Sequence, residues 1–408
     1  MATLSSVLTH PEAPLVLAAI MAGPVAVLAP LGCAPLMVVV ATALLAQSRG
    51  RLPWRSLDRH LVLLLATLAA YASLSVLWSD QPLTTVAGSL SLIGTLICGV
   101  IVLGTAATLS AEGRQRVELA LALGVILGFV ALAALQFNIR LTAQSEYMTR
   151  LRLSLLSRGV IVVSLLLWPT LLVLRHRPLP SALVAVLATG TILSSDIGGA
   201  KLGLAGGLLC GLAGLAAPRL AGRAMGYGAA ILVIAAPFLA LKLPEPQGVM
   251  DHWPQFSTSA LHRMVIWNFT AEHIIERPIL GWGLESSRWI PGADDDTRVT
   301  VKRNGDDAVM PLTHLPLHPH NAPLQWWLEL GLVGAAILAY GIIRVTGALP
   351  AALDRASRFT AFGTTGAVLA VSCVSFGAWQ KWWLAAAWLL ASFTVIAIRS
   401  GNARAAGR

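Results

Sequence analysis

Residues His318–Gly334, HPHNAPLQWWLELGLVG, join a short polar segment to a long apolar run. Asn321 stands directly before this run as a suitable N-cap, and Pro323 falls in the first turn, where a helix tolerates proline. The apolar run is long enough to cross a bilayer, and Glu329 is its only charged residue. We therefore predict a transmembrane helix that carries His320 at its mouth.

The N-terminus of this predicted helix suits an anionic substrate group. Unpaired backbone N–H groups and partial positive charge at a helix start attract anions such as a diphosphate. The same charge, together with nearby cations, favours the neutral imidazole of His320, which can then accept a proton. His318 lies in the same polar segment, and we expect it to support the site.

The composition indicates an all-α polytopic membrane protein. The chain has 408 residues, of which 56% are hydrophobic and 12% are charged, and the apolar residues come in blocks of about twenty. The net charge of +10 does not indicate nucleic-acid binding, because Lys and Arg stand at the ends of apolar blocks and form no patch with aromatic residues. The charge instead reports membrane topology.

About twelve spans are predicted, and they divide the chain into three parts. The spans lie at 13–28, 31–47, 60–78, 83–108, 117–138, 156–174, 179–195, 200–217, 226–243, 321–343, 359–377 and 383–398. We expect nine spans in residues 1–243, one large outer loop in residues 244–320 and three spans in residues 321–408. Arginines in alternate loops place both termini in the cytoplasm and the large loop outside.

The large loop has its own expected order. Ser257 or Thr258 can cap a helix that ends near Glu276, with Arg263 and Trp267 along one face. Further on, the sequence predicts a turn at the membrane surface around Trp282, between two glycines, and then an exposed charged lobe over residues 294–307.

Arg158 and Lys201 are further candidates, because each is a cation among apolar residues at the outer end of a span. An unpaired charge in that position is costly, so we favour a function over simple contact with lipid headgroups. Glycines at positions 199, 203, 207 and 211 form a stripe that lets another helix approach closely. Lys201 falls on the opposite helix face.

Two possible metal sites are weighed against simpler interpretations. His314, His318 and His320 could bind zinc, and the three aspartates at 294–296 could hold a divalent ion. No carboxylate or cysteine accompanies the histidines, and the four cysteines lie in separate apolar blocks. We expect loop histidines and a solvated acidic run, with no metal and no cofactor.

Glu329 and the glycines that follow it have structural interpretations. For Glu329 an ion pair that locks helices together is favoured over a catalytic role. Gly331 and Gly334 are interpreted as positions of close helix packing.

Several of these residues together resemble one protein family. His320-Asn321, nine further residues and then Gly-Leu-Val-Gly at 331–334 are similar to the signature of the O-antigen ligases. Arg263-x-x-x-Trp267, followed by ERPILGWG at 276–283, resembles the large periplasmic loop of the ligase and polymerase superfamily. The number of spans and the position of the loop are also similar over nearly the whole chain.

The resemblance implies a membrane-embedded, GT-C-like glycosyltransferase of the bacterial inner membrane. Such an enzyme takes a glycan from undecaprenyl diphosphate at the periplasmic face and joins it to a lipid A core sugar, by an inverting reaction that needs no metal. His320 would be the general base and Arg263 a diphosphate contact. Lys201 stands where the family has a second arginine, and a lysine lacks its bidentate geometry.

Two other functions remain open. A polymerase of the same superfamily would join lipid-linked repeat units of O-antigen or exopolysaccharide. A polytopic transporter would also use many spans, but it is expected to contain two related halves with broken helices, and the sequence indicates neither.

Overall fold

The apolar blocks of the sequence form long helices. The computed structural model describes residues 10–142, 146–303, 306–349 and 354–406. Each of the twelve predicted segments falls mainly on a helix, but several run past its end, and residues 373–377 of the segment 359–377 lie in the loop after α14. Before the large loop the helices are α2 (Ala13–Leu28), α3 (Cys33–Gln47), α4 (Arg59–Leu74), α5 (Pro82–Ala106), α6 (Ala111–Thr142), α7 (Glu146–Leu174), α8 (Pro178–Ser194), α9 (Gly198–Ala216) and α10 (Pro218–Ala240). After the loop they are α13 (Ala322–Ala348), α14 (Arg355–Ser372) and α15 (Lys381–Ala406).

Length and composition mark most of these helices as membrane spans. Among the described residues, nine helical segments are long and apolar enough to cross a membrane, and α2 and α8 are shorter apolar helices. Helix α14, which packs along α9, completes the twelve predicted segments. The predicted class, an all-α polytopic membrane protein, is confirmed.

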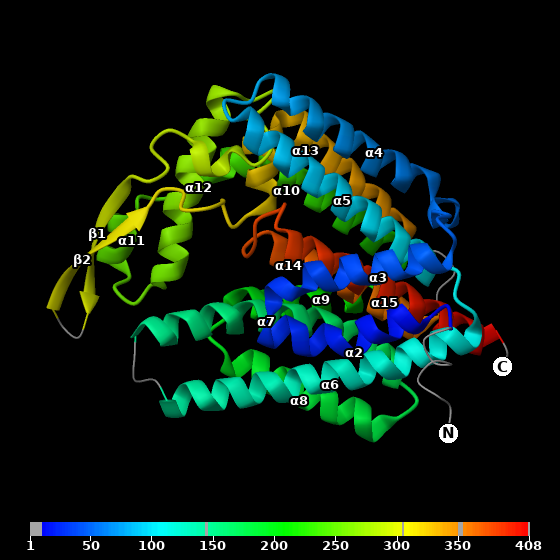
Figure 1. The fold of residues 1–408 in the computed structure, drawn as a ribbon. Helices are drawn as coiled ribbons and strands as arrows, with labels where there is room; N and C mark the ends of the chain where they lie inside the picture. Colours follow the sequence, from blue (N-terminus) through cyan, green and yellow to red (C-terminus); the bar gives the residue numbers. More distant parts are fainter. Residues whose placement is uncertain (1–9, 143–145, 304–305, 350–353, 407–408) are drawn as a thin grey trace.

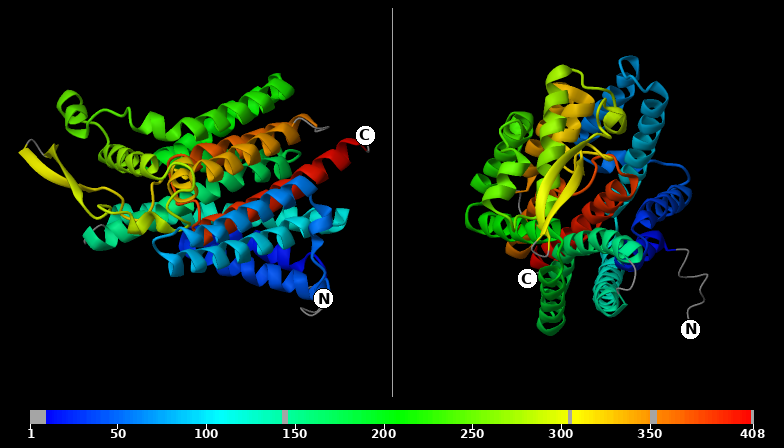
Figure 2. Two further views of the ribbon diagram at one scale, coloured as in Figure 1. Left: turned by 90° about the horizontal axis from the view of Figure 1, so that it is seen from above. Right: turned by 90° about the vertical axis from the view of Figure 1, so that its left-hand side faces the viewer.

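The helices form two groups that Figure 1 shows one above the other. In the larger, lower group, α9 packs along α14, α2 packs against α6, and α7 and α15 lie among them. In the upper group, α10 packs along α13, and α4 also contacts α13. Helix α5 packs on α3, α15 and α4, so it joins the two groups. The other views show the helices running side by side (Figure 2).

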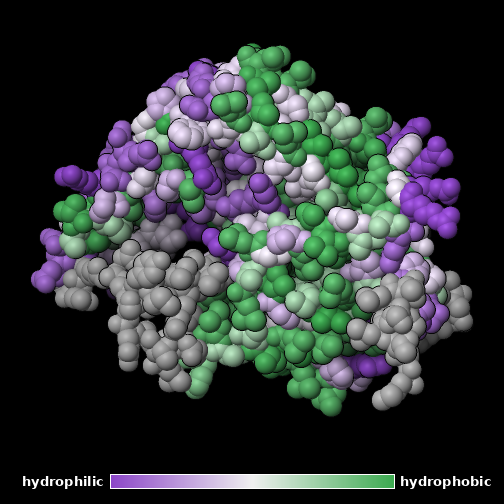
Figure 3. Space-filling model, in the orientation of Figure 1, coloured by the Kyte–Doolittle hydropathy of each residue, from purple (hydrophilic) through white to green (hydrophobic). Residues whose placement is uncertain are grey.

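Hydrophilic and hydrophobic residues occupy separate parts of the protein surface. In Figure 3, hydrophilic residues gather on the side that carries the large loop and on the opposite side, and hydrophobic residues predominate between them. Both chain ends are marked on the side away from the loop (Figures 1 and 2). A hydrophobic band between two polar ends is the surface that a bilayer requires.

The large loop contains two helices and a β-hairpin. Helix α11 (Pro246–His252) is short, and α12 (Thr258–Glu276) begins at the predicted place, where the Ser257 hydroxyl accepts from the N–H of Ala260 at 3.4 Å. Strands β1 (Asp296–Arg303) and β2 (Asp306–Thr313) pair antiparallel, with Val299 opposite Met310.

The hairpin was not predicted from the sequence, which indicated only an exposed charged lobe here. Val299 and Val301 are buried against α11 and α12, and Arg298, Thr300 and Lys302 are exposed. This alternation is the period of a half-buried strand. The alternation was not recognised in the sequence, because the charged residues on the solvent face of the strand made the whole segment look like a polar loop.

Helix α13 starts as the sequence predicts. The side chain of Asn321 accepts from the N–H of Leu324 at 3.1 Å, and Pro323 stands in the first turn. Asn321 is therefore the N-cap. The cap fixes the direction in which the preceding histidines enter the helix.

Helix α13 is broken at Gly331, whose φ of 62° and ψ of −161° are not helical. Residues 278–283 lie against the break and bond to its backbone: the Trp282 N–H donates to Leu328 O at 2.9 Å and the Gly283 N–H to Glu329 O at 2.8 Å. The Leu332 N–H donates in return to Pro278 O at 2.8 Å. The expectation of an unbroken span was wrong, because an inserted segment supplies the hydrogen bonds that the helix loses.

Two glycines make this insertion possible. A Cβ on Gly331 would lie 2.2 Å from the carbonyl oxygen of Ile279, and one on Gly281 would lie 2.5 Å from the backbone carbon of Glu329. Both contacts are with backbone, which cannot move aside. Gly331 thus serves a backbone break, and its interpretation as a position of close helix packing was wrong.

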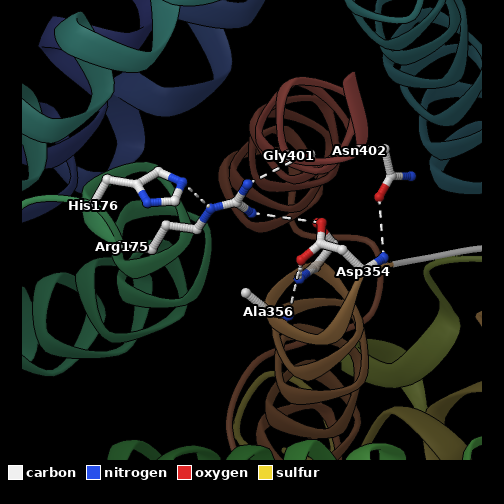
Figure 4. A network of polar contacts seen from close by, with 7 residues as sticks. Arg175, His176, Asp354, Ala356, Gly401 and Asn402 are labelled. Carbon is white, nitrogen blue, oxygen red and sulfur yellow. Dashed lines mark hydrogen bonds and ion pairs between the residues drawn. The ribbon is translucent and has the colours of Figure 1, made fainter. Parts of the chain in front are cut away.

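At the end away from the loop, a group of polar contacts ties three helices together (Figure 4). Arg175, after α7, lies 3.5 Å from the Asp354 carboxylate and donates to Gly401 O at 3.2 Å in α15. Asp354 caps α14 by accepting from the N–H of Ala356 at 3.0 Å, and its own N–H donates to Asn402 at 3.2 Å. These contacts fix the ends of α7, α14 and α15 relative to one another.

Replacing Gly331 with alanine is expected to destabilise the protein. The combination of positive φ and extended ψ is open almost only to glycine, and forcing another residue into it costs about 1–3 kcal/mol before the clash with Ile279 is counted. The midpoint of thermal unfolding in detergent, followed by tryptophan fluorescence, should fall clearly. Gly347→Ala in the same helix is the control, since nothing lies within 4 Å of its added Cβ. Equal midpoints for the two variants would contradict this account.

Candidate active site

His320 lies in the loop that leads into α13, and one hydrogen bond fixes its ring. Its φ of 53° is in the left-handed region. Its Nδ1 is 2.5 Å from the carbonyl oxygen of Ser375, in the loop between α14 and α15. Because a carbonyl only accepts, Nδ1 carries the hydrogen and the neutral ring keeps its lone pair on Nε2. Nε2 is therefore the atom that can take a proton.

His318 is buried beside His320 and supports it. The two ring centroids are 4.3 Å apart, and the backbone N–H of His320 donates to Nδ1 of His318 at 3.2 Å. The hydrogen of neutral His318 is then on Nε2, which lies 3.0 Å from the carboxamide of Gln380. That amide accepts the hydrogen if its oxygen is turned toward the ring, which also gives the buried Oε1 of Gln380 a partner.

Both imidazoles are held in the neutral form at neutral pH. Burial is the main reason that the pKa of His318 is lowered to about 3. Burial is also the largest cause of the lowered pKa of His320; the bond to Ser375 opposes the shift, and the charge of Arg263 adds to it. Neutral His320 has the protonation state of a general base.

Helix α12 presents Trp267 and Arg263 to this loop. The indole N–H of Trp267 donates to the carbonyl of Pro319 at 2.9 Å, which holds the residue between the two histidines. Nη1 of Arg263 donates to the Ser259 hydroxyl at 2.8 Å, and its Nε is buried without a hydrogen-bond partner. Burial lowers the pKa of this guanidinium. Arg263 therefore has donor capacity left for an anion.

Glu329 is fully buried in α13 and accepts hydrogen bonds from three neutral donors. These are Nε2 of Gln325 at 2.9 Å, the Ser287 hydroxyl at 2.5 Å and the backbone N–H of Glu285 at 2.5 Å. Within the part of the chain that the structure describes, Glu329 forms no salt bridge. The expected ion pair is therefore wrong, and neutral groups hold the carboxylate.

These hydrogen bonds continue into the loop between α14 and α15. The oxygen of Gln325 accepts from the N–H of Ala378 at 2.8 Å. The same loop supplies Ser375, which fixes His320, and Gln380, which contacts His318. Ser375, Ala378 and Gln380 were not predicted from the sequence, because they lie far from the histidines in the chain and carry no motif.

Two cations near the histidines were also missed. Glu285 has a left-handed φ of 62°, and burial raises the pKa of its carboxyl, an effect that the charges of Arg288 and Lys381 oppose. Arg288 also acts on His318 electrostatically. Arg288 lies in the 3-10 helix η4 (Ser286–Trp289), and Lys381 begins α15. Both side chains are exposed at the edge of the site.

Arg158 and Lys201 occupy different surroundings. The Arg158 guanidinium carbon lies 5.8 Å from the centre of the Trp382 ring, a cation–π contact. Lys201 is exposed on α9 and forms no hydrogen bond or salt bridge with another described residue. A Cβ on Gly199, two residues earlier, would touch the Ser375 hydroxyl at 2.4 Å, so the first turn of α9 lies close to the loop that holds His320.

Trp282 holds the inserted segment in place. Its indole N–H donates to the carbonyl of His273 at 2.9 Å, and the Arg277 guanidinium lies 3.9 Å from its ring centre. Its backbone N–H bonds to Leu328 in α13. Trp282 therefore supports the site through the broken helix.

The three histidines that were considered as zinc ligands do not gather at one point. His314 contacts Thr297 at 3.0 Å and Gly292 at 3.2 Å, whereas His318 and His320 contact each other. Across the described ranges, no group of three or more His, Cys, Asp or Glu side chains is arranged to hold a metal ion.

An apolar cavity of about 550 Å³ opens directly after the N-cap of α13. Ala322, Pro323 and Trp326 line it, together with Trp379 from the loop that follows α14. The indole nitrogen of Trp379 is buried without a hydrogen-bond partner. Part of the cavity lining is thus close in the chain to His320 and to Gln380, which contacts His318.

The fold and this site define a polytopic membrane protein with a polar site at the mouth of a broken span. Residues 147–339 match the family model described as O-antigen ligase. This match covers just under half of the chain and supports membership of the O-antigen ligase superfamily.

Proteins named "putative polysaccharide ligase" in three Rickettsia species are similar to the chain. The Rickettsia conorii protein is 28% identical over 83% of this chain and 79% of its own length. The Rickettsia bellii protein is 26% identical over 79% of this chain and 77% of its own length. The Rickettsia prowazekii protein is 35% identical over 36% of this chain and 35% of its own length. No solved structure matches the chain significantly.

Replacing Glu329 with glutamine is expected to destabilise the protein although the shape is kept. Both oxygens of Glu329 accept hydrogen bonds, from Ser287, Gln325 and the N–H of Glu285. In glutamine an NH₂ group, which only donates, replaces one of these oxygens. At least one buried donor then loses its acceptor, at a cost of about 1–3 kcal/mol. The unfolding midpoint in detergent measures the loss. Glu272→Gln, at an exposed position of α12, should leave the midpoint unchanged. An unchanged midpoint in Glu329→Gln would show that these bonds contribute little.

Proposed function

We propose that the protein is a glycosyltransferase that moves a glycan from undecaprenyl diphosphate to a hydroxyl of a lipid A core sugar. The observation that carries the proposal is the state of His320. Its Nδ1 is bound to Ser375, its imidazole is neutral, and Nε2 is left as a base beside Arg263. The match of residues 147–339 to the O-antigen ligase family model supports the same class of reaction.

The chemistry requires one base and a cationic surface. Nε2 of His320 takes the proton of the acceptor hydroxyl, whose oxygen bonds to the anomeric carbon of the donor sugar. The bond from that carbon to the diphosphate breaks on the opposite side, and its electron pair leaves with the diphosphate. The product is inverted at the anomeric carbon.

Arg263 is proposed to hold the leaving diphosphate. Its unpartnered Nε and its electrostatic action on His320 support this role. Lys201 and Arg158 are proposed as further contacts from the spans. Arg288 and Lys381 add positive charge at the edge of the site.

The polyprenyl chain is proposed to lie along α13. The cavity that begins at Pro323 shares Trp326, Leu338 and Ile342 with a second apolar cavity of about 500 Å³, which continues to Leu349. Helix α13 is on the order of 40 Å long, enough to cross the hydrocarbon core. An apolar path of this length suits a long isoprenoid.

In this proposal the site faces the periplasm of the bacterial inner membrane. Residues 244–320 form the periplasmic loop that recognises the acceptor, and residues 1–243 and 321–408 contain the spans. Both termini are then cytoplasmic, which agrees with the arginines at that end.

Polymerase activity is the alternative within the superfamily. The same base and diphosphate contacts serve either acceptor. The test gives purified protein a carrier-linked glycan together with lipid A core. A core-linked product in the mass spectrum supports a ligase, and a longer carrier-linked glycan with bare core supports a polymerase.

A transporter is the alternative of another class. Transporters use broken helices to leave backbone groups free for a substrate. The groups at Gly331 are instead bonded to residues 278–283. Substrate uptake by proteoliposomes without glycan transfer would support transport.

His320→Ala should reduce transfer by about 10²–10⁴-fold while donor binding survives. Base catalysis needs the neutral ring, and burial sets the pKa of His320 below its ordinary 6.5. The wild-type rate should therefore stay level from alkaline pH down to that value and fall only in more acidic solution. Transfer rates across this range and binding of the carrier-linked donor provide the measurements. His252→Ala, at an exposed histidine, is the control. A rate that decreases as the pH rises would exclude this role.

Removing metal ions is expected to leave the rate unchanged. Three of the four ring nitrogens of His318 and His320 already have hydrogen-bond partners, so the pair offers one free nitrogen. Arg263 supplies positive charge for the leaving group. The enzyme should be dialysed against EDTA, checked by elemental analysis and assayed. Lost activity that one divalent metal restores would contradict the mechanism.

A further inference from the structure

A cationic cavity of about 640 Å³ lies between α10 and α13, far from His320. Arg219, Arg223 and Tyr227 of α10 line it with Arg344 of α13. Arg344 is separated from the start of α13 by roughly 30 Å of helix. The cavity is thus at the opposite end of the helix that leads away from the proposed active site.

No carboxylate among the described residues pairs directly with the three arginines. Among the described residues, none of the three guanidinium groups forms a hydrogen bond or salt bridge, and no carboxylate lines the cavity. Asp58, on which Arg344 acts electrostatically, caps α4 through the N–H groups of its first turn and does not line the cavity. Like charges that share one space repel one another, so an anion between them would be stabilising.

The sequence builds this cavity through spacing. Arg219 and Arg223 are one helical turn apart on α10. Gly222 and Gly226 alternate with them, and a Cβ on Gly226 would lie 2.4 Å from the Thr346 hydroxyl. The glycines bring α10 against α13, and the arginines line the space beside this contact. Membrane topology explains positive charge at this end of the spans, but it does not explain why three charges line one cavity.

We propose that this cavity binds the phosphate headgroup of an anionic phospholipid. The arginines take the phosphate, for which guanidinium groups have suitable donors. The lipid is favoured over free phosphate by what adjoins the cavity. Tyr227 lines the cavity, and Ile231, one helical turn further along the same face of α10, is exposed, so acyl chains have an apolar surface next to the headgroup site.

The test measures lipid binding by the full-length protein purified in detergent. Native mass spectrometry and a fluorescence titration would compare phosphatidylglycerol with phosphatidylcholine. The wild type should retain phosphatidylglycerol selectively. The triple variant Arg219→Gln, Arg223→Gln, Arg344→Gln should bind it roughly a hundredfold more weakly, on the order of fivefold for each arginine. The triple Arg→Lys variant should retain most of the binding, since it keeps the charge.

The matched control removes three other exposed arginines at the same proposed membrane face, by Arg49→Gln, Arg51→Gln and Arg55→Gln. Equal losses in both Gln variants would overturn the proposal, because charge alone would then explain binding. Wild-type affinity in the cavity variant would overturn it as well. Inorganic phosphate that binds as tightly as the lipid would overturn the lipid assignment. Each variant is first checked for a wild-type elution volume and unfolding midpoint, and the Arg→Lys variant decides if the Gln variant does not fold.

Discussion

A helix that breaks inside a membrane leaves backbone N–H and C=O groups that lipid cannot satisfy, and this constraint shapes the centre of the protein. Helix α13 breaks at Gly331, and residues 278–283 satisfy the freed groups on both sides of the break. The Tyr71 hydroxyl of α4 donates to Leu330 O at 3.1 Å and satisfies another. The large loop therefore packs into the break in α13 at this point, and the segment must carry glycines where the two backbones meet.

The same insertion positions the proposed active site. Residues 278–283 lead directly to Glu285, whose left-handed backbone is held by its N–H bond to buried Glu329. Glu329 is bonded in turn to Gln325, and Gln325 to the loop that carries Ser375. The break, the buried carboxylate and the base are thus one bonded unit. The two sequence motifs, far apart in the chain, are two halves of a single structure.

The sequence predicted the parts of the fold that depend on local chemistry. The length of the apolar runs predicted the spans. Asn321 and Ser257 predicted helix starts, because an N-cap bonds only to residues next to it in the chain. The break at Gly331 was missed, since a glycine in an apolar run looks the same in a packed helix and in a broken one. Ser375 and Gln380 were missed for a similar reason: a carbonyl or a carboxamide becomes a site residue only when folding brings it to a histidine.

His318 shows why a buried imidazole is useful where it never acts as an acid. Burial lowers its pKa to about 3, so at neutral pH it stays uncharged and Nδ1 remains an acceptor. That acceptor binds the N–H of His320, whose positive φ a residue with a Cβ adopts only when its surroundings hold it there. A leucine could fill the space but would leave the N–H without a partner, and a lysine would bring a charge that burial opposes. A histidine kept neutral by burial meets both requirements, and it leaves Nε2 of His320 as the free base of the pair.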